Sequence, residues 1–305
     1  MPEISIIVPV YDVEKYIKQC LRSIEKQLFD DFECICVDDC SPDNSVDIIE
    51  TFVKKDDRFK LIRHERNLKL GMARNTGIEN ATGKYILFVD SDDWIQEEML
   101  SEVYHAFKVN DADSVWYNTY VHEINGKIHP MYDRMHPIFR NGNCRFNVGA
   151  FELMATSSFA WSKAYKLEKV LESNVRFPAE LRFEEMVFFY KYFTKYKKAC
   201  YVDQPLYHYR RRENSAVENL SHGTDNCKAE DTLYEFLEIY KYLKDENYFD
   251  EYKLALCQYL TKIIGNHNLP NQHEKIVKLT KEVFKKIDFP NDFKDLEYKE
   301  NIEMW

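Results

Sequence analysis

The first 110 residues alternate between two patterns of hydrophobic and polar positions. Short apolar runs with β-branched residues have the length of buried strands, and they cover residues 4–8, 32–37, 61–63 and 85–89. Between these runs, apolar residues recur at helical spacing and predict helices over residues 13–27, 45–54, 71–80 and 97–110. Strands that alternate with helices predict an α/β fold with a mostly parallel, twisted sheet flanked by helices.

The pattern changes after residue 110. Two strand-like runs, residues 115–122 and 127–131, flank Asn125-Gly126, a dipeptide typical of a β-hairpin turn. Residues 134–223 are mixed in pattern and rich in aromatic side chains. Beyond residue 224, three apolar stripes at helical spacing predict a C-terminal helical region.

Polar loops follow three of the four early strands. They begin with Pro9-Val10-Tyr11, with Asp38-Asp39-Cys40 and with Asp90-Ser91-Asp92. Because the carboxyl ends of parallel strands meet at one edge of a sheet, we expect these loops to surround one crevice.

Clustered carboxylates in such a crevice repel one another unless a cation joins them. Oxygen ligands suit Mg²⁺ or Mn²⁺, which commonly also hold substrate phosphates. A metal-bound nucleotide would place Tyr11 against the base, Asp39 on a base N–H and Asp92 on the metal. Lys69 and Arg74 are the basic residues nearby in sequence that could meet the phosphates. Alternatively, the aspartates are ordinary turn residues or helix caps, and Arg74 lies on the exposed surface of a helix.

The composition of the chain limits the classes of protein to which it can belong. The 305 residues are 45% hydrophobic, enough for a large core, and the net charge of −10 argues against general nucleic-acid binding. No apolar run reaches the roughly 18–20 residues of a membrane span, and no basic leader precedes the first strand, so we expect a cytoplasmic protein.

Neither GxGxxG nor a P-loop motif occurs. Cys34 and Cys36 share one strand without a second ligand pair, so we expect reduced thiols and no zinc.

Five segments in the first hundred residues resemble, in order and spacing, the successive motifs of family 2 glycosyltransferases. They are residues 5–11, 37–45, 67–78, 81–85 and 88–94. The resemblance implies the A-type glycosyltransferase fold for nucleotide-diphospho-sugars. It also implies an inverting transfer from a UDP-sugar.

The resemblance assigns roles at matching positions. Pro9, Tyr11 and Asp39 match positions that contact uracil, Asp92 matches the ligand of Mn²⁺ or Mg²⁺, and Asp90 faces the ribose or the metal. The remaining nucleotide-sugar positions are Val10, Asn67, Gly71, Arg74, Ser91 and Arg210. Cys40 stands where the family more often has glycine, which suggests a slightly different backbone there.

The later motifs match more loosely. Trp161 and Lys163 lie in a stretch that resembles the acceptor site of bacterial polysaccharide members. Glu185 stands where those members have an Asp as catalytic base, and its side chain reaches one methylene further. Glu184 lies beside it, toward the acceptor. The alternative for both glutamates is stabilisation of a helix N-terminus. His208 resembles a late histidine ligand of the metal, and the basic segment that contains Arg210 could close over the diphosphate. The alternative for that segment is a basic strand end on the surface.

We therefore expect residues 1–110 to form the nucleotide-sugar-binding half, 111–223 the acceptor-binding and catalytic-base half, and 224–305 a helical extension. The late motifs resemble enzymes of capsule, exopolysaccharide or lipopolysaccharide synthesis, so the expected acceptor is a saccharide or a lipid-linked saccharide. Lysines on one predicted helix suggest peripheral contact with the inner face of the cell membrane, while a solvated face or a homodimer interface are alternatives. These lysines are Lys275, Lys278, Lys281, Lys285 and Lys286.

Two rival functions share part of this pattern. A sugar-phosphate nucleotidyltransferase would have a parallel sheet and an acidic metal site, but it would normally carry a Gly-rich basic loop where this chain has Pro9-Val10. A non-catalytic nucleotide- or glycan-binding protein would be expected to lack carboxylates that this chain retains, among them Asp39, Asp92 and Glu185.

Overall fold

The computed structural model divides the chain into two compact units. Unit 1 contains Met1–Asn147, Phe159–Glu180 and Lys195–Glu213, and unit 2 contains Val148–Ser158, Leu181–Thr194 and Asn214–Trp305. The residues that the structure describes are 1–131, 139, 142–179, 181, 184–213, 228–266, 278, 280–283, 285–287 and 292. The chain passes between the units several times. The functional division near residues 110 and 223 stays a prediction.

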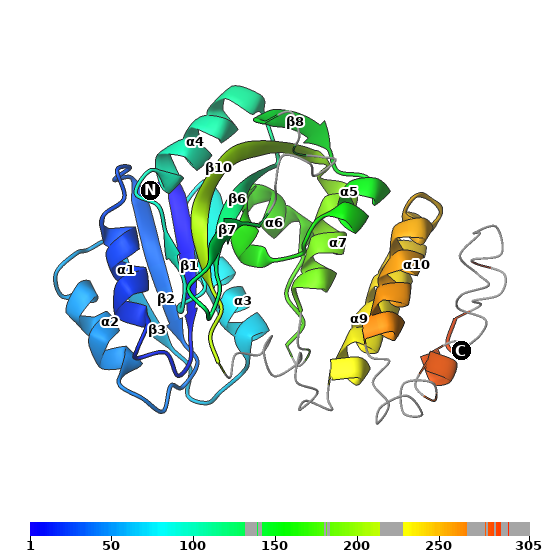
Figure 1. Ribbon diagram of the computed structural model, residues 1–305, viewed down its shortest axis with the longest axis horizontal. Coiled ribbons are helices and arrows are strands. Elements are labelled where there is room, and N and C mark those ends of the chain that lie inside the picture. Colours follow the sequence, from blue (N-terminus) through cyan, green and yellow to red (C-terminus); the bar gives the residue numbers. More distant parts are fainter. Residues whose placement is uncertain are drawn as a thin grey trace. The chain divides into compact units, whose positions relative to one another are not determined.

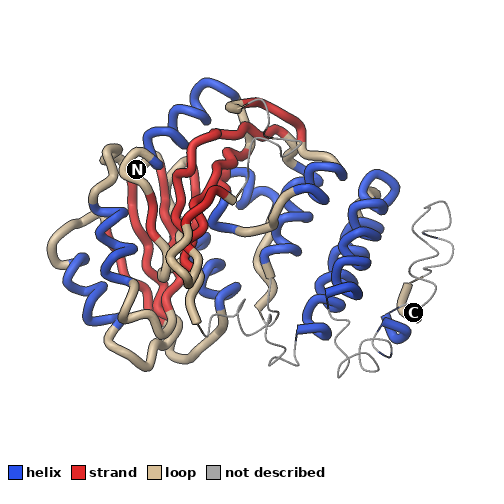
Figure 2. The backbone as a smooth tube through the Cα atoms, in the orientation of Figure 1, coloured by secondary structure: helices blue, strands red, loops and turns tan. Residues whose placement is uncertain are grey.

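A ten-stranded mixed sheet forms the centre of unit 1 (Figures 1 and 2). Its main path runs in the order β3-β2-β1-β4-β9-β6-β10-β5, with β7 paired to β6 and β8 paired to β10. The run β3-β2-β1-β4 and the β6–β10 pair are parallel, whereas β9, β5, β7 and β8 are antiparallel to their partners. The strands are β1 (Ile4–Val10), β2 (Phe32–Asp38), β3 (Phe59–Arg63), β4 (Tyr85–Phe88), β5 (Trp94–Ile95), β6 (Ser114–His122), β7 (Ile128–Pro130), β8 (Cys144–Asn147), β9 (Lys163–Lys166) and β10 (Lys198–Arg210).

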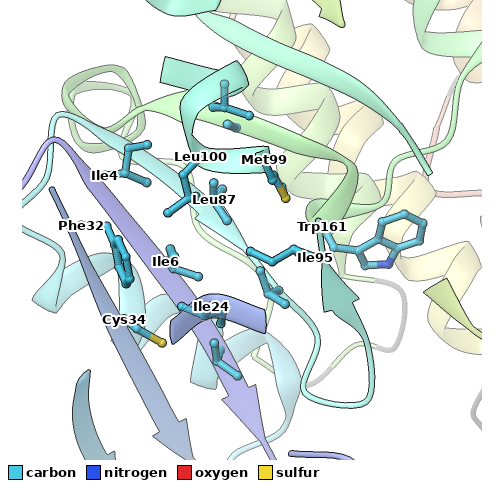
Figure 3. Close-up of a cluster of buried hydrophobic side chains, with 14 of the residues drawn as sticks. Ile4, Ile6, Ile24, Phe32, Cys34, Leu87, Ile95, Met99, Leu100 and Trp161 are labelled. Carbon is cyan, nitrogen blue, oxygen red and sulfur yellow. The ribbon is translucent and has the colours of Figure 1, made fainter. Parts of the chain in front are cut away.

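Alternating residues of β1 direct their side chains into two helical layers. Ile4, Ile6 and Val8 join a buried cluster that includes residues of α1 and α4 (Figure 3). Ile7 points the other way, toward α3, where Gly77 permits close approach because an added Cβ would lie 2.2 Å from Ile7 Cγ2. The helices of unit 1 are α1 (Ile17–Glu25), α2 (Ser45–Val53), α3 (Leu70–Asn80), α4 (Met99–Asn110), α6 (Leu167–Ser173) and the short η1 (Ala160–Ser162).

The predicted α/β class with its helical flanks is confirmed, and so is the hairpin of β6 and β7. The first helix begins at Ile17 rather than near residue 13, because Val13 and Tyr16 form turns before it. Cys34 and Cys36 lie in the core of unit 1, and all seven cysteines in the described residues are free thiols. In the same part of the chain, no helix is both long and apolar enough to span a membrane.

Unit 2 is helical in its described part. Its helices are α5 (Ala150–Ala155), α7 (Glu185–Lys195), α9 (Lys228–Asp245) and α10 (Phe249–Asn266). Helices α9 and α10 pack together, and they bury the first predicted stripe as well as Leu256 and Leu260 of the second. Of the third stripe, Val283 and Ile287 are buried, whereas Ile276 and Phe284 fall outside the described residues, as does Lys275. The other four lysines of that segment are exposed.

Candidate functional site

The loops after β1 and β2 meet at one edge of the sheet, as predicted. Strands β1 and β2 are parallel and in register, with Val10 beside Asp38. The amide of Asp39 then donates to the carbonyl of Val10 at 2.8 Å, which ties the two loops together. Pro9 and Val10 are themselves buried, but Tyr11 projects from the edge with 48% of its surface exposed. The ring of Tyr11 is therefore available to a ligand.

Asp39 organises the segment that leads into α3. Its Oδ1 accepts hydrogen bonds from the Leu68 amide and from His64 Nδ1, both at 2.7 Å. Its Oδ2 accepts from the amide of Lys69 at 2.8 Å, and the side chain is only 4% exposed. These bonds hold Lys69 at φ +76°, in the region that favours glycine. Asp39 thus shapes the loop, and Oδ2 retains capacity to accept a further hydrogen bond.

Cys40 adopts φ +62°, in the left-handed region that favours glycine. Whether the backbone here differs from that of family members with glycine at this position stays a prediction. Asp38 Oδ1 accepts from the amide of Ser41 and thereby closes the turn around Cys40.

Arg74 is a buried residue of the site rather than a surface helix position. Its side chain is 1% exposed and its guanidinium lies 5.4 Å from the centre of the Phe177 ring. Its Nη2 donates to Oδ1 of Asp90 at 2.9 Å. Arg74 therefore compensates the charge of the acidic loop. Nearby, Asn67 accepts from the amide of Lys69 at 3.1 Å, and Gly71 is buried in the first turn of α3.

Two aspartates of the acidic loop keep side chains that reach solvent. Those of Asp90 and Asp92 are 24% and 22% exposed, whereas Ser91 is buried. Asp92 Oδ2 accepts from Nε of Arg212 at 2.7 Å, and Nε of Arg210 donates to the Asp92 carbonyl at 2.9 Å. The basic segment at the end of β10 therefore lies against the acidic loop rather than forming an isolated strand end.

Asp93 plays a structural part. It is 1% exposed, and its two oxygens accept from the Tyr207 hydroxyl at 2.8 Å and from the Arg210 amide at 2.7 Å. Burial, reinforced by the charges of Asp92 and Asp90, raises the pKa of Asp93 well above its usual range. The Tyr207 hydroxyl also accepts from the Asp90 amide at 3.0 Å. Tyr207 therefore fixes the acidic loop to β10, a role that its place in an apolar strand pattern did not reveal.

The exposed carboxylates suit a hard divalent cation. In the part of the chain that the structure describes, no three Asp, Glu, His or Cys side chains converge on a point that could hold a metal. Asp90 and Asp92 would thus supply one or two oxygen ligands, and phosphate and water oxygens would complete the shell, which is the usual arrangement for Mg²⁺.

His208 does not join the aspartates in such a cluster. Its Nδ1 lies 2.8 Å from Nε2 of His122, and its ring stacks on Trp94 with 4.8 Å between centroids. Burial and the nearby His122 lower the pKa of His208 to about 4, so its ring is neutral at pH 7. A neutral imidazole is able to bind a metal, but its role as a ligand stays a prediction.

The two residues predicted near the acceptor from the Trp161 segment are buried in unit 1. The Trp161 ring is 3% exposed and stacks against Phe159 and Tyr207, with centroids 4.7 and 4.8 Å away. Lys163 is 1% exposed and donates to the Ser162 hydroxyl at 2.8 Å. Both residues are thus part of the interior of unit 1, and their contact with an acceptor stays a prediction.

Glu184 and Glu185 belong to unit 2. Glu185 begins α7 and is partly exposed, whereas Glu184 is 3% exposed and its carbonyl accepts from the Phe188 amide. A carboxylate in the first turn of a helix can stabilise the helix dipole, so this position fits the alternative given above, and the catalytic role of Glu185 stays a prediction.

Comparisons with known proteins identify the family of this chain and proteins that share its fold. Residues 5–171 match the model of the family described as glycosyl transferase family 2. A protein named as glycosyltransferase EpsH of Bacillus subtilis is 31% identical over 267 residues, which is 85% of this chain and 74% of that protein. The poly(ribitol-phosphate) β-N-acetylglucosaminyltransferase TarS of Staphylococcus aureus is 30% identical over 224 residues, which cover 68% of this chain and 35% of TarS.

Solved structures share the fold. The structure of TarS residues 1–349 in complex with UDP-GlcNAc has a TM-score of 0.74 at 23% identity, and the match covers 93% of this chain and 81% of that one. The mannosyltransferase PcManGT of Pyrobaculum calidifontis, in complex with GDP-Man and Mn²⁺, has a TM-score of 0.55 at 15% identity, covering 93% and 80%. At these identities, the likeness concerns the fold.

Proposed function

Because the chain belongs to glycosyl transferase family 2, we propose that it is an inverting, metal-dependent enzyme that uses a UDP-sugar as donor. The observation that carries the proposal is the arrangement of Tyr11, Asp39 and the acidic loop at one edge of the sheet. An open aromatic ring and a buried acceptor suit uracil, and the exposed carboxylates of Asp90 and Asp92 suit a metal-bound diphosphate. The UDP-GlcNAc bound by TarS supports this choice of donor.

The metal is proposed to be Mn²⁺ or Mg²⁺. Asp92, with Asp90 as accessory, would hold it, and the bound ion would neutralise negative charge on the departing diphosphate. The hard oxygen donors of the acidic loop fit both ions, and the Mn²⁺ in the PcManGT complex supports the choice. Arg210 would add positive charge beside the same diphosphate.

Proton transfer is assigned to Glu185. An acceptor hydroxyl attacks the anomeric carbon on the face opposite UDP, and Glu185 takes the hydroxyl proton during attack. The new glycosidic bond forms as the bond from the anomeric carbon to the diphosphate oxygen breaks, and its electron pair leaves with UDP. Attack from the opposite face inverts the anomeric centre, so an α-linked donor gives a β-linked product.

The acceptor is proposed to be a saccharide or a lipid-linked saccharide of a bacterial surface polymer. The acceptor named for TarS, poly(ribitol-phosphate), is a polyol phosphate, and it supports a polyhydroxylated polymer as the kind of acceptor. Peripheral contact with the inner face of the membrane would bring the enzyme to a lipid-linked acceptor. Co-sedimentation with anionic liposomes at low and high salt tests that contact, and no binding at low salt would reject it.

A screen of UDP-sugars for metal-dependent UDP release tests the proposed reaction. We expect release with at least one donor and Mn²⁺, and none after chelation. Asp92→Ala should abolish release, whereas the matched variant Asp111→Ala should retain it, because the Asp111 carboxylate is 79% exposed and pairs with Lys198. Normal activity of Asp92→Ala would reject the metal assignment. Pyrophosphate release from UTP and a sugar phosphate would indicate a nucleotidyltransferase instead.

The base is tested separately. Glu185→Gln should bind UDP with wild-type affinity but lose transfer, because the amide cannot accept the hydroxyl proton. An unchanged rate would remove Glu185 as the base while leaving the donor site intact.

A further inference from the structure

The two arginines at the end of β10 are held in different ways. Arg212 forms an ion pair with the carboxylate of Asp92, at 2.7 Å. The side chain of Arg210 instead donates to neutral oxygens, from Nε to the Asp92 carbonyl at 2.9 Å and from Nη2 to Gln19 Oε1 at 2.7 Å. Among the described residues, no carboxylate forms an ion pair with Arg210. The charge of Arg210 and its remaining N–H donors are therefore available to an anionic ligand.

Two aromatic rings lie against the guanidinium of Arg210. Its central carbon is 5.1 Å from the centre of the Tyr16 ring and 4.7 Å from the centre of the Trp94 ring. The ring of Tyr16 also meets the second arginine, because the guanidinium of Arg212 lies 5.4 Å from the same centre. The face of an aromatic ring attracts a cation but carries no net charge. The rings therefore hold Arg210 in place without neutralising it.

The turn before α1 fixes the position of Tyr16. The amide of Tyr16 donates to the Val13 carbonyl at 2.8 Å, and the amide of Val13 donates to the Ser45 hydroxyl at 3.2 Å. Val13 belongs to the buried core of unit 1, so this turn is anchored independently of the arginines. The same loop carries Tyr11, which is proposed to meet the base. One connection between β1 and α1 thus supplies an aromatic ring for the base and another for the arginines.

We propose that Tyr16 is a positioning residue for the donor diphosphate, since it forms with Trp94 and Gln19 a neutral cage that holds Arg210 beside the acidic loop. The inference rests on the proposed function, in which Arg210 meets the diphosphate. Tyr16 acts on the ligand through the arginine that its ring holds. Without the ring, the guanidinium would occupy several positions, and the ligand would have to order it on binding, at a cost in affinity.

Binding of UDP and of uridine to the full-length protein, both with Mn²⁺, separates this role from a general effect on the site. Tyr16→Leu keeps an apolar side chain but removes the ring, and it should weaken UDP binding about three- to tenfold, in line with the loss of cation–π contacts. Uridine has no phosphate, so its Kd should stay within about twofold of the wild-type value. Tyr16→Phe keeps the ring and should bind both ligands as the wild type does.

Tyr104→Leu is the matched control. Its ring is also partly buried and also meets a cation, with Lys108 Nζ 5.6 Å from its centre. It lies against Tyr85 at the start of β4, however, whereas the acidic loop follows the end of that strand. Tyr104→Leu should therefore retain wild-type affinity for UDP even if the free energy of unfolding falls as much as in Tyr16→Leu.

A double-mutant cycle with Arg210→Gln tests the contact in the absence of any ligand. In urea unfolding, the double variant of Tyr16→Leu and Arg210→Gln should lose less stability than the sum of the two single losses, because each single change already removes the same contact. The cycle should show the same pattern for the affinity of UDP.

Three results would overturn the proposal. Additive losses in unfolding would show that Tyr16 does not hold Arg210. Equal weakening of uridine and UDP by Tyr16→Leu would assign the ring to the base instead. Equal weakening of UDP by Tyr104→Leu would reduce the effect to general stability. If the wild type binds no UDP, the proposed donor fails, and the cycle without ligand still decides for or against the cage around Arg210.

Discussion

The guanidinium of Arg212 donates a hydrogen bond to the carboxylate of Asp92, with 2.7 Å between Nε and Oδ2. Asp92 is also the proposed metal ligand, so a guanidinium and a divalent cation compete for one oxygen. Both side chains are partly exposed, at 29% for Arg212 and 22% for Asp92, which places the pair between a surface ion pair and a buried one. Such pairs contribute about 0.2–1 kcal/mol near a surface, little enough for a metal ion to displace.

Removal of this competitor should strengthen metal binding. We expect Arg212→Gln to bind Mn²⁺ about two- to fivefold more tightly without nucleotide, in line with an ion pair of up to about 1 kcal/mol. Titration calorimetry measures this directly. The matched control is Arg211→Gln, whose guanidinium pairs with Glu123 at 3.3 Å instead. Equal or weaker Mn²⁺ binding by Arg212→Gln would show that the arginine does not compete.

The hydrogen bonds of Asp39 should make it important for stability as well as for nucleotide binding. In Asp39→Asn, the side-chain NH₂ group would face a backbone or imidazole N–H, where a carboxylate oxygen now accepts a hydrogen bond. We therefore expect the free energy of unfolding to fall by about 1–3 kcal/mol. Urea unfolding of the nucleotide-free protein measures it. Asp12→Asn is the control, because Asp12 is exposed and asparagine tolerates its φ of +55°. If the free energy of unfolding fell equally in both variants, the hydrogen bonds of Asp39 would not account for the loss.

Relief of the left-handed conformation at Cys40 should stabilise the protein. Cys40→Gly removes a steric cost of about 1–2 kcal/mol, partly offset by the greater freedom of glycine in the unfolded chain, for a net gain of about 0.5–1 kcal/mol. Thermal or urea unfolding checks the sign. Cys40→Ala keeps a Cβ at the same φ and should gain nothing, so a similar gain in both variants would point to loss of the thiol instead.

Gly77 should resist a substitution that usually stabilises helices. Alanine raises helix propensity by about 1 kcal/mol, but here its Cβ would approach Ile7 Cγ2 to 2.2 Å and cost about 1–3 kcal/mol or more. We expect net destabilisation of Gly77→Ala by urea unfolding. The double variant with Ile7→Ala should be less destabilised than the sum of the two single variants. Additive losses would show that α3 and β1 can separate without strain.

Local patterns in the sequence are sufficient to predict the elements that carry the proposed nucleotide site. The strand at 32–37 and the helix at 45–54 were predicted to within a residue of β2 and α2, because each is specified by its own apolar periodicity. The same reasoning predicts that the loops of Asp39 and Asp92 lie at one edge of the sheet, since parallel strands bring their loops together there.

The parts that were missed depend on distant partners. Strands β5, β8 and β9 have two to four residues each and carry too little periodicity to be recognised. His64 and Tyr207 have ordinary local surroundings in sequence, and their roles appear only once they hydrogen-bond to Asp39 and Asp93. Lys69 and Cys40 adopt positive φ against their intrinsic preference, which a rule based on residue type cannot foresee.

The bond between Tyr207 and the Asp90 amide spans 117 residues of chain. On the ribosome, at about 5–20 residues per second, the acidic loop therefore emerges roughly 6–25 s before the tyrosine that fixes it. During that interval, the early strands can pair while the loop that is proposed to bind metal has no anchor. The nascent protein should thus acquire its parallel strands first and its complete catalytic edge only after β10 has been synthesised.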